Sequence, residues 1–152
     1  MQGPNHVIRT TSFPIEPGED QETNPGVFGR ALADYVASQI CTRGESVEGI
    51  IPEDFGYCIM LRRKPFRLWV GCGNRQERTD EWIAFAVAES GFIARTLGTI
   101  DPSREVEHLS EMLGEIIRAA PGVEAYSFLY DGEQTLSFGD KLRAAPLSAL
   151  WA

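Results

Sequence analysis

Apolar and polar residues alternate along several short segments of the chain, which is the pattern of half-buried β-strands. Five such segments lie at residues 6–15, 57–63, 67–72, 82–88 and 124–130. The second and third flank Lys64-Pro65-Phe66, where proline favours a turn, so they are expected to form a hairpin. Residues 82–88 contain three alanines, and a short helix is the alternative there.

Two other segments repeat apolar residues at the spacing of an amphipathic helix. The first is expected to begin with Asn24 as its N-cap and Pro25 in the first helical position, and to end before Gly44. The second follows Asp101-Pro102-Ser103 and stops at Pro121-Gly122. Its apolar stripe comprises Val106, Leu109, Leu113, Ile116, Ile117 and Ala120.

These elements predict the order β-α-β-β-β-α-β, an α+β fold with an antiparallel sheet of four or five strands and two helices on one face. The length of 152 residues fits a single domain spanning 1–152. Residues 1–5 are expected to be loose. Residues 139–152 form an apolar tail that docks on its own domain or on a partner, and Leu147, Leu150 and Trp151 are candidate contacts of a homo-oligomer.

Charge and hydropathy narrow the classes of partner. The chain carries 14 Lys and Arg against 22 Asp and Glu, a formal charge of −8, which disfavours binding to nucleic acid. No stretch approaches the roughly 20 apolar residues of a membrane span, and the N-terminus lacks a secretory signal, so no membrane partner and a cytoplasmic location are expected. Nothing in the sequence indicates a cofactor or a metal.

The charges are unevenly distributed. Residues 57–78 hold six cations and one anion, and the cations are Arg62, Arg63, Lys64, Arg67, Arg75 and Arg78. This basic segment is either the solvated tip of a hairpin or a site for an anion or an acidic partner. By contrast, residues 16–22 form a strongly acidic loop.

The three cysteines, Cys41, Cys58 and Cys72, contain no CxxC pair and are expected to be reduced thiols. Cys58 and Cys72 are almost equidistant from the predicted turn at Pro65. Whether they face each other depends on a one-residue choice of register, so core burial and a redox pair both remain open.

No linear catalytic signature is present. Gly71-Cys72-Gly73 follows a strand, but Gln76 stands where a dinucleotide-binding loop needs its third glycine. The most specific segment is Glu53-Asp54-Phe55-Gly56-Tyr57. It is either functional or structural, with an acid bonded in a turn, Gly56 allowing close packing and both aromatic rings in the core.

Three segments together resemble a group of small uncharacterised bacterial proteins that share an acid-acid-aromatic-glycine-aromatic motif. They are Asn24-Pro25-Gly26, Glu53-Asp54-Phe55-Gly56-Tyr57 and Leu68-Trp69-Val70-Gly71-Cys72-Gly73-Asn74. The resemblance spans residues 6–90 and implies a bacterial origin and an α+β domain. It brings no activity with it.

The sequence therefore favours a non-enzymatic protein-binding domain whose acidic faces meet a basic partner, in the manner of an immunity protein or an antitoxin-like inhibitor. The candidate binding residues are Glu19, Asp20, Glu53, Asp54, Tyr57, Trp69, Arg62 and Arg67. The alternative is a small enzyme or ligand-binding domain with a pocket near Glu53, Asp54, Trp69 and Cys72.

Overall fold

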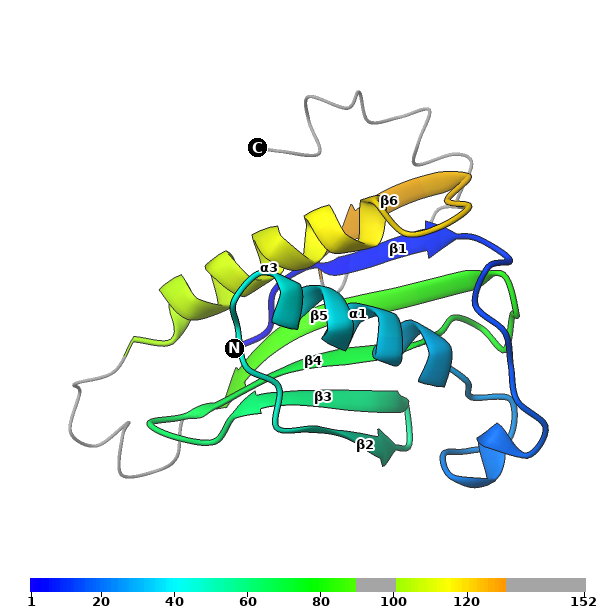
Figure 1. Ribbon diagram of the computed structural model, residues 1–152, viewed down its shortest axis with the longest axis horizontal. Helices are drawn as coiled ribbons and strands as arrows, with labels where there is room; N and C mark the ends of the chain where they lie inside the picture. The colour runs from blue at the N-terminus through cyan, green and yellow to red at the C-terminus, as the bar shows by residue number, and fades with distance from the viewer. Residues whose placement is uncertain (90–100, 131–152) are drawn as a thin grey trace.

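The fold is an α+β arrangement in which one antiparallel sheet carries both helices on the same face (Figure 1). The computed structural model describes residues 1–89 and 101–130. The strands are β1 (Asn5–Arg9), β2 (Gly49–Glu53), β3 (Gly56–Arg62), β4 (Arg67–Asn74), β5 (Glu81–Glu89) and β6 (Ala125–Leu129). The helices are α1 (Arg30–Thr42) and α3 (Ser103–Arg118), with a short 3-10 turn, η1, at Glu19–Gln21.

The sheet has six strands in the order β2-β3-β4-β5-β1-β6, all antiparallel. The predicted β3–β4 hairpin is confirmed, and residues 82–88 belong to strand β5 and not to a helix. The prediction of four or five strands misses β2. Its five residues include Gly49 and Pro52, which are depleted in strands, so only its pairing with β3 defines it.

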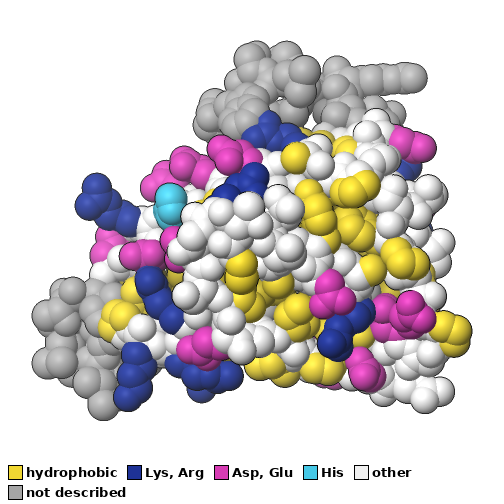
Figure 2. Space-filling model, viewed as in Figure 1, with side chains coloured by type: hydrophobic (Ala, Val, Ile, Leu, Met, Phe, Trp, Pro, Cys, Tyr) yellow, Lys and Arg dark blue, Asp and Glu magenta, His cyan; other side chains and the backbone are white. Residues whose placement is uncertain are grey.

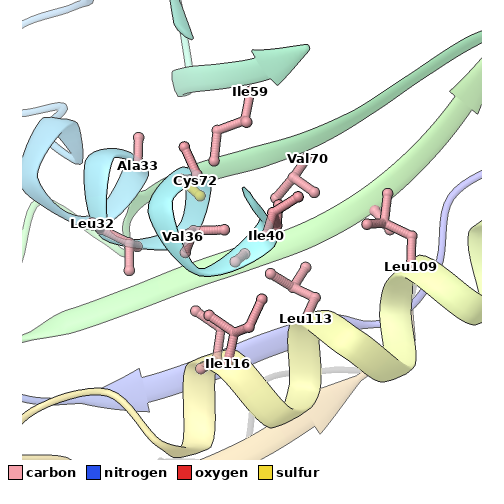
Figure 3. Close-up of a cluster of buried hydrophobic side chains, with 14 of the residues drawn as sticks. Leu32, Ala33, Val36, Ile40, Ile59, Val70, Cys72, Leu109, Leu113 and Ile116 are labelled. Atoms are coloured by element: carbon pink, nitrogen blue, oxygen red, sulfur yellow. The ribbon is translucent and has the colours of Figure 1, made fainter. Parts of the chain in front are cut away.

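The main core lies between the helices and the sheet. Helix α1 packs over β3 and β4, and α3 packs over β5 and β1 and against α1, so their apolar side chains meet in one core. Figure 3 shows part of this core with Leu32, Val36, Ile40, Leu109, Leu113, Ile116, Ile59 and Val70. The predicted stripe of the second helix is buried throughout, which confirms its orientation. The tight packing of this face fixes the sheet as a platform whose opposite face is free of the described helices.

The first helix begins at Arg30, five residues after the position predicted for its first turn. Asn24 is not its N-cap. The Asn24 carbonyl accepts a hydrogen bond from the Val27 amide, and Gly26 has a φ of 77°, so these residues form a turn. The carboxylate of Glu19 accepts from the Gly29 amide at 3.1 Å and so satisfies the helix start from a distant segment. The predicted end is confirmed, with Gly44 at a φ of 90°.

Residues 1–5 were expected to be loose, but hydrogen bonds attach them to the sheet. The Met1 ammonium donates to the Ala88 carbonyl at 2.8 Å, and the Gly3 amide donates to the Ala86 carbonyl at 2.9 Å. The first strand is also shorter than predicted and ends at Arg9. The start of the chain is therefore tied to β5.

Some predictions fall outside the described residues. They concern the tail at residues 139–152 and the oligomer contacts Leu147, Leu150 and Trp151. Within residues 1–89 and 101–130, no helix has the length and apolar character needed to cross a membrane.

Candidate functional site

The face of the sheet opposite the helices, here called the outer face, carries a second set of apolar side chains. Successive residues of a strand point to opposite faces, so Cys58 and Met60 of β3 lie on the outer face while Tyr57 and Ile59 enter the helix-side core. Trp69 of β4 pairs with Met60 and lies on the outer face as well. A sheet with one face solvated normally shows polar residues there, so this composition indicates a surface with a role.

Three aromatic rings group together on the outer face. Phe55, in the turn between β2 and β3, lies 5.9 Å from Trp69 and 5.7 Å from Phe85 of β5, measured between ring centroids. Trp69 and Phe85 are 6.0 Å apart and meet edge to face. Gly71 leaves the space that the Phe85 ring occupies, since a Cβ there would lie 2.3 Å from that ring. The three rings thus form one contiguous apolar wall.

Beside this wall lies a hollow of about 280 Å³, which we call the outer hollow. Its lining residues are Glu53, Phe55, Cys58, Met60, Arg67, Trp69 and Glu89. Cys58 and Met60 are buried, whereas Phe55 is 40% exposed. The outer hollow therefore has an apolar floor, an aromatic wall and charged groups at its rim.

The rim charges differ in how they are engaged. Arg67 and Glu89 form an exposed ion pair at 3.7 Å, which contributes little to stability. The side-chain carboxylate of Glu53 has no hydrogen-bond or ion-pair partner within residues 1–89 and 101–130. One carboxylate at the rim is therefore uncompensated by the described part of the chain.

The thiol in the floor is unreactive. Burial raises the pKa of Cys58 to about 11, and the nearby carboxylates of Glu53 and Glu89 add to the shift. Cys72 lies on the helix face, as Figure 3 shows, and burial raises its pKa further. Because Cys58 pairs with Gly71 and Cys72 pairs with Tyr57, the two thiols occupy opposite faces, and the redox-pair alternative is wrong.

Thiol labelling should report this arrangement. At pH 8 the native protein is expected to react rapidly with an aromatic disulfide reagent at Cys41 alone, because Cys41 is exposed and the other two thiols are buried and protonated. Denaturant should make all three react. Rapid native labelling of Cys58, identified by peptide mapping, would contradict the closed floor described above.

The structure brings some of the predicted site residues together at the outer hollow and places others elsewhere. Glu53, Trp69 and Arg67 come together at the outer hollow. Asp54 is next to it in the β2–β3 turn but does not line it. Cys72, the remaining member of the predicted pocket, lies across the sheet.

Within the acidic loop, the predicted binding residues Glu19 and Asp20 are engaged by the domain itself. Glu19 is buried at the start of α1, where burial raises its pKa. Asp20 accepts a hydrogen bond from the Gly26 amide at 3.0 Å. Glu22 accepts from the buried Tyr57 hydroxyl at 3.3 Å. These contacts hold the loop onto the domain.

Most cations of the basic segment, residues 57–78, form ion pairs with acidic residues of the same chain. Arg62 pairs with Glu105 at 2.9 Å, and its guanidinium lies over the Phe66 ring. Further pairs are Arg63–Glu48, Arg75–Glu81 and Arg78–Asp80. On the helix side, acidic and basic side chains are interspersed (Figure 2). This pairing favours the interpretation of a solvated hairpin over an anion site.

The segments around Gly56 and Gly73 pack against each other so closely that both positions require glycine. A Cβ at Gly56 would lie 2.2 Å from the Cys72 carbonyl oxygen, and one at Gly73 would lie 2.5 Å from the Phe55 carbonyl oxygen. The Asn74 side chain also accepts a hydrogen bond from the Phe28 amide at 2.9 Å, which links these segments to the residues that follow Asn24-Pro25-Gly26. These segments therefore serve close backbone packing, which agrees with the structural interpretation except that Phe55 is exposed.

Sequence reasoning missed four lining or wall residues: Cys58, Met60, Phe85 and Glu89. The signal was present in the alternation of β3 and β5, whose second faces are apolar too. That pattern was consistent with a strand buried on both sides. Only the position of the described helices shows which of the two faces they cover.

Within the described residues, no group of three or more His, Cys, Asp and Glu side chains could hold a metal ion. Comparison of the chain with family models, curated proteins and solved structures gives no match. The geometry of the outer hollow is therefore the basis for assigning a function.

Proposed function

We propose that this protein is a non-enzymatic protein-binding domain that engages a basic partner through the outer hollow. The observation that carries the proposal is the aromatic wall of Phe55, Trp69 and Phe85 on a sheet face without a described helix. Protein interfaces combine an apolar, aromatic centre with a charged rim, and aromatic and arginine side chains dominate their energetics. The outer hollow has this anatomy.

The chemistry of the lining favours recognition over the alternative of an enzyme. The Cys58 thiol is protonated at neutral pH, since its pKa is about 11, and a nucleophile needs the thiolate. Among the described residues that line the hollow, none is a histidine that could serve as its base. A volume of about 280 Å³ is also at the lower end of the range for small-molecule pockets, while it accommodates a side chain of a partner.

The formal charge of −8 supports a basic partner, because opposite net charges accelerate encounter. An immunity or antitoxin-like role is the concrete form of this proposal in a bacterial cell. The contact surface differs from the sequence-based one, since Glu19 and Asp20 are engaged internally and only Glu53, Arg67 and Trp69 remain at the site.

Differential capture tests the proposal. The wild-type protein and the double variant Phe55→Ser/Trp69→Ser are immobilised, exposed to extract of the source organism, and their bound proteins are quantified by mass spectrometry. At least one basic protein is expected to be retained by wild type and reduced about tenfold or more by the variant, because interface aromatic residues each contribute about 2 kcal/mol or more.

The matched control changes an aromatic residue remote from the outer hollow. Tyr130 is 56% exposed, so Tyr130→Ser should leave both folding and capture unchanged. Circular dichroism verifies that the double variant folds. Equal retention of every basic protein by wild type, double variant and control would overturn the proposal that this surface binds a partner.

A further inference from the structure

We infer that the outer hollow receives an arginine side chain of the partner, with its stem over the apolar floor and its guanidinium against the aromatic wall beside Glu53. The inference rests on the proposed function and names the anchoring group. It follows from three features of the lining: an exposed aromatic surface, a carboxylate without a partner among the residues that the structure describes, and a weakly held ion pair.

Charge selects a cationic occupant. The rim holds Glu53 and Glu89 against Arg67, so its acids exceed its bases. The single base already faces Glu89 across the β4–β5 pair, which leaves Glu53 to meet an incoming cation. Arg67 and Glu89 are both at least half exposed, so an incoming guanidinium can share Glu89 at little cost. An anionic occupant would meet two carboxylates.

The aromatic wall distinguishes arginine from other cations. A guanidinium is planar, weakly hydrated and stacks on aromatic faces while it binds a carboxylate. The chain already uses this combination within itself. The Arg62 guanidinium carbon lies 5.1 Å from the centroid of the Phe66 ring. The Nη2 atom of the same guanidinium forms an ion pair with Glu105 Oε2 at 2.9 Å. The outer hollow offers the same ring and carboxylate without the arginine.

The apolar floor fits the stem of such a side chain. Cys58 and Met60 are buried beneath the opening, and their sulfur atoms present a polarisable surface to three methylene groups. The protonated state of Cys58 keeps this floor uncharged. The charged head group would then lie at the aromatic wall and the rim, next to the carboxylate of Glu53.

The test uses the intact protein and a probe that copies the arginine terminus. N-propylguanidinium is titrated against the indole N–H signal of Trp69 in heteronuclear NMR spectra, with the signal assigned by its loss in Trp69→Phe. N-propylurea, a neutral isostere, and butyrate, an anion, are titrated in the same way. N-propylguanidinium is expected to shift the signal saturably and to bind about tenfold more tightly than either comparison compound.

Two variants with the same change in charge locate the head group. Glu53→Gln should weaken the binding of N-propylguanidinium about fivefold, while the neighbouring Asp54→Asn should leave it nearly unchanged, because only Glu53 lines the hollow. Equal binding of the guanidinium and the urea, tighter binding of butyrate, or equal effects of the two variants would overturn the inference.

The outcome is separable from that of the capture experiment. A partner lost from the Phe55→Ser/Trp69→Ser variant, together with no preference for N-propylguanidinium, would keep the protein-binding function and reject the arginine anchor. Selective binding of N-propylguanidinium without any partner that depends on the hollow would establish a small-cation site and reject the proposed function.

Discussion

Replacing Gly56 with alanine is expected to destabilise the protein by about 3 kcal/mol or more, a large part of the stability of a domain of this size. The added Cβ would lie 2.2 Å from the Cys72 carbonyl oxygen, a backbone atom that cannot rotate away. Gly56 also has a φ of 143°, which alanine adopts only with strain. Both effects act on the junction that positions Phe55 beside the outer hollow.

Urea denaturation followed by circular dichroism measures this loss. Gly49→Ala is the matched control in the same hairpin, because nothing lies within 4 Å of its Cβ position. That variant should change the free energy of unfolding by less than about 1 kcal/mol. A Gly56→Ala protein as stable as Gly49→Ala would show that the β2–β3 turn is not packed as described.

Acidification from pH 6.5 to pH 4 should cost about 3 kcal/mol of folding free energy through His6 alone. His6 is 5% exposed and lies between the Tyr126 hydroxyl, 2.8 Å from its Nδ1, and the Ser110 hydroxyl, 3.0 Å from its Nε2. Burial and the Arg118 guanidinium lower its pKa from 6.5 to about 4.

The direction follows from the proton count. Below pH 6.5 the unfolded chain binds a proton at His6 that the folded chain excludes until about pH 4. Stability from this group is therefore complete above pH 6.5, is lost progressively as the pH falls to 4, and changes no further below that.

A comparison of wild type with His6→Gln isolates this contribution, because the carboxylates titrate in both proteins. The difference between their free energies of unfolding should shrink by about 3 kcal/mol between pH 7 and pH 4. A difference between wild type and His6→Gln that stays constant with pH would rule out a neutral buried imidazole.

Local patterns predicted much of the fold because each acts over a few residues. The alternation in β3, β4 and β5 and the helical stripe of α3 reflect burial on one face, so those elements and their faces could be identified. Predictions that depended on distant residues were less accurate. The start of α1 was misplaced because its cap, Glu19, lies ten residues before Gly29.

At the candidate site too, the sequence indicated the residue types but not which of them lie close together. Glu53, Trp69 and Arg67 were identified by type, but their association depends on the pairing of β2, β3 and β4, and β2 was not predicted. Glu19 and Asp20 were assigned to a surface because composition cannot distinguish a solvated carboxylate from one that bonds a backbone amide. Their partners, Gly26 and Gly29, are set by the fold of the loop.

The sequence by itself determined the α+β class, the helix-side core and the excess of negative charge, because periodicity and composition encode burial and net charge directly. The tertiary structure decided which sheet face the described helices cover, which acids pair within residues 1–89 and 101–130, and where the aromatic rings gather. These properties arise from contacts between segments far apart in the chain, and linear spacing carries no information about such distances.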